Sequence, residues 1–396
     1  LLAYAYPALR DAQRMRRVHA ELGRSVAGAG GSAGSRWPVD RDRLAALLGC
    51  DGLVLHAKDA AWQADVYVEL ASATAIALTH ASQLAQDLEI FASQEFGIAT
   101  LADRHSRASA LMPQKRNPYA LAVVRAMAGT AAGELTSLLV SLHTGSARTD
   151  HFHVINGAIP RLMHEAVAVM RLMAAVADGL TLDVARMAQV ARDGFTVAAD
   201  VADVVAQHAG LDYRTAHHVV GRAVRDALEA GRAADALSAA DITAAAAATG
   251  AGDVAIDDDV LAAALDPERC ATERHQPGSS APAEMERMLQ DVAGGIGDGR
   301  TWSRDARAGV AAALVGADAA LAGRQALLTA LSPFAVLGRG YAIVADEHGA
   351  AVTAAAALRP GMTVDMRFAD GSARARVTDV EAVDGAGVPP GAAPPG

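Results

Sequence analysis

One long stretch of sequence, from Asp59 to about Gly97, repeats apolar residues at steps of three and four positions. The repeating residues are Val66, Leu70, Ala73, Ile76, Ala77, His80, Leu84, Leu88 and Phe91. This spacing places them on one face of an α-helix. Two more long helices are expected, from about Tyr119 to Leu142 and from about Pro160 to Gly179. Because long helices bury such faces against one another, the sequence favours an elongated helical bundle.

The composition also favours a mainly helical chain. Hydrophobic residues make up 52% of the 396 positions, and aromatic residues make up only 4%. Alanine and leucine dominate, and both lose little conformational freedom on entering a helix. A chain of this length can form two or three domains and bury a sizeable core.

Charge and cysteine content argue against several classes of function. The formal net charge is −10, and an acidic chain lacks the basic field that drives non-specific nucleic-acid binding. Cys50 and Cys270 lie far apart, without the spacing of a zinc site or a disulfide framework, which suits a reducing cytoplasm. We therefore expect a cytoplasmic protein with no metal and no cofactor.

The N-terminus carries no signal-peptide pattern, because Arg10, Asp11 and Arg14 interrupt its first apolar stretch. We expect no stretch that is long enough and uncharged enough to span a membrane. The chain begins with Leu1 and not with Met, so we expect a piece of a longer reading frame.

Residues 105–118 carry the most specific motif, His-Ser-Arg-Ala-Ser-Ala-Leu-Met-Pro-Gln-Lys-Arg-Asn-Pro. It resembles the signature loop of the fumarase/aspartase superfamily of lyases. The resemblance implies elimination of an amine or water from a succinate-like group, with release of fumarate. A base must take a proton from the carbon beside a carboxylate, and fixed donors must stabilise the charge that develops.

The resemblance assigns roles within this loop. Ser109 occupies the position of the catalytic serine, and Lys115 and Asn117 occupy positions that hold the substrate carboxylate, with Gln114 beside them. Outside such a motif, Ser109 would be interpreted as an ordinary loop or cap hydroxyl. The family glycine and second serine are replaced by alanines 108 and 110, and the first replacement stiffens a loop that needs to close.

Downstream residues resemble argininosuccinate lyase. The segment from Gly194 to Gly221 and the loop Gly278–Pro282 match its motifs, and the likeness covers roughly residues 1–290. The matching positions of the first segment are Ala199, Asp200, Ala202, Asp203, Tyr213, Arg214, Ala216, His217, Val219, Val220 and Gly221. His217 and His218 are expected to be helix surface, since no acidic or thiol ligand completes a metal set.

Three departures weaken the match in the catalytic region. The first catalytic region of the family, with its histidine, would precede Leu1, and the glutamate that pairs with that histidine is replaced by Ala122. Residues 146–156 offer Arg148, His153 and Asn156 where argininosuccinate lyase holds its substrate with Tyr, Gln and Lys. Arg148 and His153 are candidate substrate contacts. The neighbouring histidines 143 and 151 are expected to belong to a solvated helix end.

The C-terminal tail resembles a different protein. Residues 331–344 (LSPFAVLGRGYAIV), with Leu358–Gly361 and Asp370-Gly371, resemble the C-terminal segment of the exodeoxyribonuclease VII large subunit. The likeness covers about residues 302–380 and includes no nuclease catalytic residues. It suggests an interaction or assembly module, while a small β appendage is the plainer interpretation. The pairing suggests a chimeric or misassembled reading frame more than a genuine fusion.

The sequence thus predicts a mainly α protein with a fumarase/aspartase-type long-helix bundle, a helical C-terminal domain and a small helix-plus-β tail. The expected parts are a bundle over 1–178, a helical lyase domain over 179–292, a linker over 293–301, the tail over 302–380 and a disordered end over 381–396. Members of the superfamily are tetramers with active sites built from several subunits, so the resemblance implies a homotetramer.

Three functions compete at this point. The first is a lyase that releases fumarate from an N-substituted succinate, with argininosuccinate as the default substrate. The second is a non-catalytic helical scaffold, as in lens crystallins that share this fold. The third is an exonuclease VII-associated subunit that binds a helical partner or DNA, although the acidic charge argues against nucleic acid.

Overall fold

The computed structural model describes residues 1–146, 148–331, 342–368 and 370–381, and helices dominate these ranges. They form two compact units, 1–308 and 309–396, which are considered separately below. The expectation of a mainly α chain with a small β-containing tail is confirmed.

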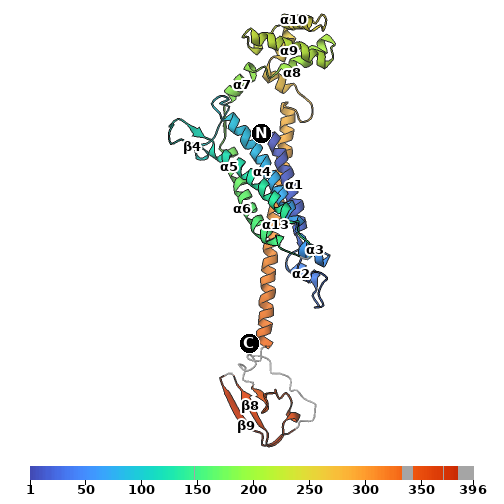
Figure 1. Cartoon of the computed structure of the whole chain (residues 1–396), viewed down its shortest axis with the longest axis vertical. Helices are drawn as coiled ribbons and strands as arrows, with labels where there is room; N and C mark the ends of the chain where they lie inside the picture. Colours follow the sequence, from blue (N-terminus) through green and yellow to red (C-terminus); the bar gives the residue numbers. More distant parts are fainter. Residues whose placement is uncertain (147, 332–341, 369, 382–396) are drawn as a thin grey trace. The chain divides into compact units, whose positions relative to one another are not determined.

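Four long helices form the body of the first unit (Figure 1). They are α1 (Leu2–Leu22), α4 (Asp65–Phe91), α5 (Tyr119–Ser141) and α6 (His151–Asp178). The core that α4, α5 and α6 share is rich in alanine, with the larger side chains of Leu78, Leu88, Leu121, Val124 and Leu138 fully buried. Small residues let helix backbones approach closely, so the predicted bundle forms a dense interior.

Two helix boundaries differ from the sequence prediction. The stretch expected to begin at Asp59 is divided, because Ala57–Trp62 form a separate short helix, α3, and Gln63 adopts an extended conformation before α4. The His56 side chain accepts the Lys58 and Asp59 backbone N–H groups and so begins α3. Helix α6 begins before Pro160, since its buried apolar face already starts at Ile155.

Short elements connect and flank the bundle. A parallel pair joins β1 (Arg24–Ser25) to β2 (Gly52–Leu53), and an antiparallel pair joins β3 (Ala99–Thr100) to β6 (Thr181–Leu182). Helix α2 (Arg41–Leu47) begins after Asp40, whose carboxylate accepts the Arg43 N–H at 2.9 Å, as the predicted helix start requires.

A domain of shorter helices follows the bundle in sequence. It contains α7 (Val184–Asp193), α8 (Ala198–Ala209), α9 (Tyr213–Glu229), η2 (Ala234–Ala236), α10 (Ala239–Thr249), α11 (Asp258–Ala264) and α12 (Pro267–Thr272). Its separate core centres on Val201, Val205, Val219, Ile242 and Leu261. Helices α8 and α10 end at glycines 210 and 250, which adopt the left-handed conformation that glycine tolerates best.

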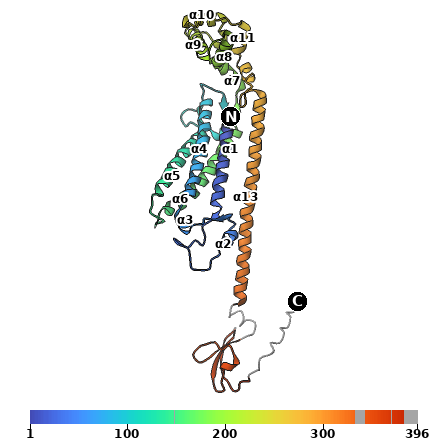
Figure 2. The same ribbon diagram turned by 90° about the vertical axis from the view of Figure 1, so that its right-hand side faces the viewer.

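The predicted linker at 293–301 is wrong, because α13 runs without a break from Pro282 to Leu331. Two of the glycines there, Gly295 and Gly299, lie against side chains of α1. A Cβ added to Gly295 would lie 3.0 Å from Leu9 of α1, and the Arg16 guanidinium lies 5.4 Å from the Trp302 ring. Figure 2 shows the start of α13 beside α1. Absent side chains thus let two helices approach closely, a role that a glycine-rich run does not reveal by itself.

The second unit holds a small antiparallel sheet in the order β7-β8-β9, formed by Ile343–Ala345, Thr363–Arg367 and Ser372–Arg376. A short helix, η3 (Ala355–Ala357), lies between the first two strands in sequence. The expected β character of 362–377 is confirmed. Most of the 331–344 motif lies outside the described residues, as does all but the first residue of the end predicted to be disordered, 381–396.

Two helical segments are apolar and long enough to cross a membrane by length and composition, so the expectation that no such stretch exists is wrong. They are Tyr119–Ser141 in α5 and Pro282–Ala326 in α13. Helix α5 contributes Leu121, Val124 and Leu138 to the bundle core, as a core helix of a globular protein would. This measure alone is weak evidence for a membrane segment.

Candidate active site

The signature loop is a β-hairpin that precedes α5. Its strands are β4 (Arg107–Ala108) and β5 (Arg116–Asn117), and Arg107 is paired with Asn117 in the register. The Ser109 N–H donates to the Lys115 carbonyl at 3.2 Å, and the Lys115 N–H donates to the Met112 carbonyl at 3.0 Å. The hairpin therefore brings Ser109, Lys115 and Asn117 to one small structure.

The Ser109 hydroxyl has a defined environment. Its Oγ accepts the Leu111 N–H at 3.2 Å and the Met112 N–H at 3.1 Å. Two backbone donors on one oxygen favour negative charge on that oxygen, because hydrogen bonds to a charged form stabilise it. The same two bonds also describe an ordinary serine turn, so the geometry permits a base without requiring one.

The base of the hairpin is held by residues that sequence analysis did not single out. Arg116 of β5 forms an ion pair with Asp103 of the short helix η1 (Asp103–His105). The Arg107 guanidinium lies 5.5 Å from the Tyr119 ring centroid, at the start of α5. The sequence offers one sign of these contacts: Arg107 and Arg116 lie within the motif, next to the candidate residues Ser109 and Asn117.

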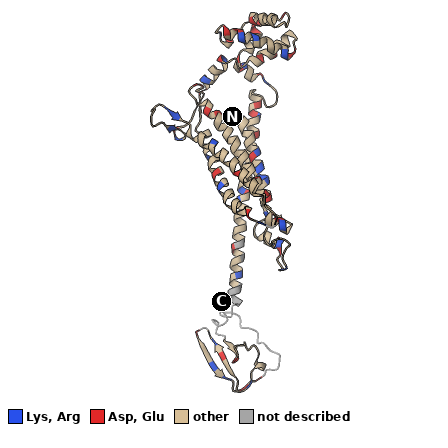
Figure 3. Cartoon of the chain, viewed as in Figure 1, with Lys and Arg blue, Asp and Glu red and all other residues tan. Residues whose placement is uncertain are grey.

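The tip of the hairpin is open to solvent. The Leu111 side chain is 91% exposed, and Gln114 and Lys115 are also exposed. Figure 3 shows the basic residues of the hairpin in blue. Within the described residues, the hairpin tip therefore leaves the candidate residues Gln114 and Lys115 in contact with water.

The other candidate substrate contacts lie at the opposite end of α5. Arg148, which pairs with Asp150 at 3.2 Å, and the exposed His153 follow the C-terminal end of α5, whereas the hairpin precedes its N-terminal end. The 23 residues of α5 span about 34 Å at ~1.5 Å per residue. One chain therefore does not bring Arg148 and His153 to Ser109.

His151 lies in a different environment from the one that the sequence predicts. His151 does not belong to a solvated helix end, because it is only 3% exposed and its Nε2 lies 2.8 Å from the Trp62 carbonyl oxygen. It joins the start of α6 to the segment before α4, a long-range contact that sequence spacing cannot reveal. His143 is exposed, as expected. Ala122, at the position of the family glutamate, lies exposed on α5.

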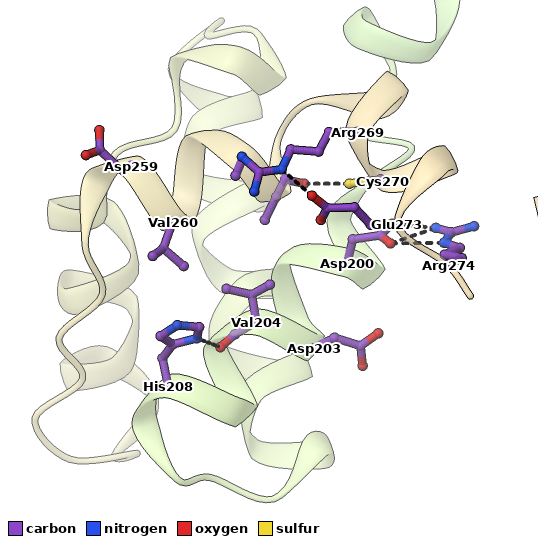
Figure 4. A pocket seen from close by; sticks show the side chains of 12 residues that line it. Asp200, Asp203, Val204, His208, Asp259, Val260, Arg269, Cys270, Glu273 and Arg274 are labelled. Carbon is purple, nitrogen blue, oxygen red and sulfur yellow. Dashed lines mark hydrogen bonds and ion pairs between the residues drawn. The ribbon is translucent and has the colours of Figure 1, made fainter. Parts of the chain in front are cut away.

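In a hollow of about 510 Å³ in the domain of shorter helices, most charged side chains are paired with one another (Figure 4). Arg274 pairs with both oxygens of Asp200, with Nη2 2.6 Å from Oδ2, and Arg269 pairs with Glu273 at 2.5 Å. Burial raises the pKa of the Cys270 thiol to about 11, with help from the Asp200 carboxylate. These partners satisfy one another, so the hollow is mainly a structural network.

No group of three or more His, Cys, Asp or Glu side chains is arranged to hold a metal ion within the described ranges. His217 and His218 lie exposed on α9, where the sequence analysis expected helix surface.

Comparison with known proteins identifies the class to which this fold and hairpin belong. Residues 1–133 match the family model described as lyase, and residues 195–272 match that of the argininosuccinate lyase C-terminal region. A crystal structure of EDDS lyase in complex with formate has a TM-score of 0.74 and 29% identity, covering 78% of this chain and 62% of that one. Over most of its first unit, the chain therefore shares the fold of the fumarase/aspartase lyases.

Curated relatives of the chain include argininosuccinate lyases. The protein from Symbiobacterium thermophilum is 33% identical over 293 residues, 73% of this chain and 61% of the relative. That from Pseudoalteromonas atlantica is 33% identical over 242 residues, 61% of this chain and 53% of the relative. The chain is argininosuccinate lyase-like, and it spans between half and two thirds of the length of these relatives.

The tail matches the model of a different family. Residues 256–376 match the family model for the exonuclease VII large subunit, which overlaps the end of the lyase match. The match begins before the tail that sequence analysis expected at 302. The predicted resemblance itself is confirmed.

Proposed function

We propose that this chain carries part of an enzyme that eliminates an amine from an N-substituted succinate and releases fumarate, with argininosuccinate as the default substrate. The observation that carries the proposal is the hairpin, which presents Ser109, with two N–H donors on its Oγ, beside Lys115 and Asn117. The printed descriptions of the relatives support it: they are argininosuccinate lyases, and a variant of EDDS lyase has been solved with bound fumarate.

The proposed chemistry has one proton transfer and one bond cleavage. Ser109, as the alkoxide, takes a proton from the carbon beside the substrate carboxylate, and the electron pair spreads into that carboxylate. The Lys115 ammonium and the Asn117 amide donate to its oxygens and stabilise the developing charge. The carbon–nitrogen bond then breaks, and the amine leaves with a proton from an acid that the described residues do not identify.

We propose that the complete site forms between subunits of a homotetramer. The separation of the hairpin from Arg148 and His153 along α5 supports this arrangement, because a second copy can supply what one chain holds too far away. Exposed apolar residues on the bundle, such as Val140, Val154 and Val167, are suited to the contact. A cytoplasmic location and a role in arginine biosynthesis are part of the same proposal.

Fumarate release by the purified chain tests the proposal, with argininosuccinate and other N-substituted succinates as substrates. Release should disappear in Ser109→Ala and persist in Ser106→Ala. Ser106 is the matched control because its hydroxyl lies in the same loop and has no hydrogen-bond partner among the described residues. Equal rates in the two variants would remove Ser109 from the mechanism.

Mixing variants tests the composite site. Ser109→Ala and Arg148→Ala chains should each be inactive alone, and mixed tetramers should regain part of the activity because some sites combine two intact halves. Lack of any recovery after verified subunit exchange would place the whole site within one chain.

A non-catalytic scaffold is the second candidate. Ala122, at the position of the family's acidic partner, is the observation behind this candidate, whereas the matched argininosuccinate lyases do not favour it. The scaffold predicts a folded oligomer that releases no fumarate from any substrate of the panel.

The match over 256–376 supports, as a separate property, binding of the tail to a helical partner, which a pull-down with the full chain would test.

A further inference from the structure

A second polar hollow lies on the outer face of α9, in the domain of shorter helices. Its volume is about 520 Å³, and its lining includes His217, His218, Gly221, Arg222 and Arg225 but no carboxylate. The opposite face of α9 is buried in the domain core, which fixes these side chains toward solvent. The two arginines make this surface locally basic on a chain whose formal net charge is −10.

The cations in this hollow are only partly used by the protein. The Arg222 Nε donates to both oxygens of Asp226 at 2.9 Å, which leaves its terminal amines without a partner among the described residues. Arg225 has no hydrogen-bond or ion-pair partner in the same ranges. The two imidazole rings lie 6.1 Å apart between centroids. Several N–H groups that line the hollow are therefore without a protein acceptor among the described residues.

Gly221 forms an opening in the middle of this surface. A Cβ built there would meet nothing within 4 Å, so no packing contact requires a glycine. Glycine inside a helix costs about 1 kcal/mol relative to alanine. A position that forgoes this stability without a packing reason is suited to close approach by a ligand.

We propose that this hollow binds the phosphate group of a small molecule. Arginine guanidinium groups donate in a planar fork that matches phosphate oxygens, and imidazole N–H groups add donors from another side. A tetrahedral phosphate accepts hydrogen bonds from more directions than a planar carboxylate does. Thr249, at the C-terminal end of α10, also lines the hollow, and the carbonyl groups at a helix C-terminus repel anions. This repulsion is reduced here because the Gly250 and Ala251 N–H groups donate to those carbonyls. The inference does not depend on the proposed lyase activity.

Calorimetric titration of the full chain with inorganic phosphate and with a phosphomonoester tests the site. Three variants at Gly221 form a matched series: Gly221→Gln, Gly221→Glu and Gly221→Lys all favour the helix and occupy open space. The Glu variant should bind phosphate roughly tenfold more weakly than the Gln variant, and the Lys variant at least as tightly as the Gln variant, because the charge lies within a few ångströms of the anion.

Arg225→Gln should weaken phosphate binding by about tenfold. Arg171→Gln, an exposed arginine of α6 with no partner in the described ranges, should leave it unchanged. Tighter binding of the phosphomonoester than of inorganic phosphate would identify a phosphorylated metabolite as the source, and the reverse would identify free phosphate. Equal affinity of the Glu and Lys variants, equal affinity for succinate, or no binding at all would overturn the proposal.

Discussion

The signature hairpin and the start of α10 are held in place by different means. The hairpin base depends on an ion pair between Asp103 and Arg116 whose side chains are 80% and 65% exposed. Before α10, the Arg232 guanidinium donates to Asp241 at 2.8 Å and 3.0 Å, and Asp241 also accepts the Ser238 N–H at 2.9 Å. Exposed ion pairs contribute little stability, whereas a partly buried network around a helix cap contributes more.

The contrast indicates where the chain is free to move. A segment that must close over a substrate is drawn from the less stable parts of a fold, and the hairpin has few contacts apart from its own backbone bonds. The domain of shorter helices has capped helices and its own core. The candidate catalytic and substrate-binding residues thus lie on the weakly held hairpin, whereas the domain of shorter helices is the more rigid region.

Ser109→Ala gives the largest expected effect. If the hairpin is a catalytic segment, fumarate release should fall by roughly 10³-fold, because a positioned base contributes on this scale. The melting temperature should not change, since the Ser109 hydroxyl makes only local loop contacts. A large loss of thermal stability together with activity would instead make Ser109 a structural residue.

Leu121→Ala should produce the largest loss of stability. Leu121 is fully buried in the bundle core, and truncating such a leucine costs about 2–5 kcal/mol through lost burial and a cavity. Denaturant unfolding measures the change in free energy. Leu111→Ala in the exposed hairpin tip is the matched control and should change stability by less than about 0.5 kcal/mol. Similar costs for the two variants would mean that the tip is covered in solution.

Asp241→Asn tests the cap before α10 and its dependence on pH. The Arg232 guanidinium beside Asp241 holds the pKa of that carboxyl well below its usual range. A lowered folded-state pKa contributes stability above the unfolded value, which is about 3.9 for aspartate, and this contribution is lost as the pH falls below it. We expect Asp241→Asn to cost about 1–2 kcal/mol at neutral pH. The wild-type and variant stabilities should converge in strong acid, and a constant difference would contradict the ionic origin.

The smallest effect is expected at the cysteines. Because burial raises the pKa of the Cys270 thiol to about 11, little thiolate is present at neutral pH, and alkylation should be slow. Cys50 is less buried and serves as the internal comparison. Mass spectrometry after timed alkylation should find Cys50 modified first. Faster modification of Cys270 would mean that the domain of shorter helices opens readily.

Local patterns made much of this protein predictable. The apolar spacing between Val66 and Phe91 predicts a buried helix face, and Asp40 predicts a helix start, because both depend on neighbours within a few residues. The motif at 105–118 identified the superfamily for the same reason: its residue types are specific and contiguous. The candidate roles of Ser109, Lys115 and Asn117 follow from that motif.

Contacts between distant segments decided the rest. The glycines at 293–301 indicate a linker by sequence, but Gly295 lies against Leu9 of α1. His151 is typical of an exposed polar residue by sequence, but it lies beside the Trp62 carbonyl. The sequence by itself indicated the long helices of the bundle and the specific motif at 105–118. Only the tertiary structure decided that α5 separates the hairpin from Arg148 and His153, because the direction and length of a helix convert a short sequence interval into a large distance.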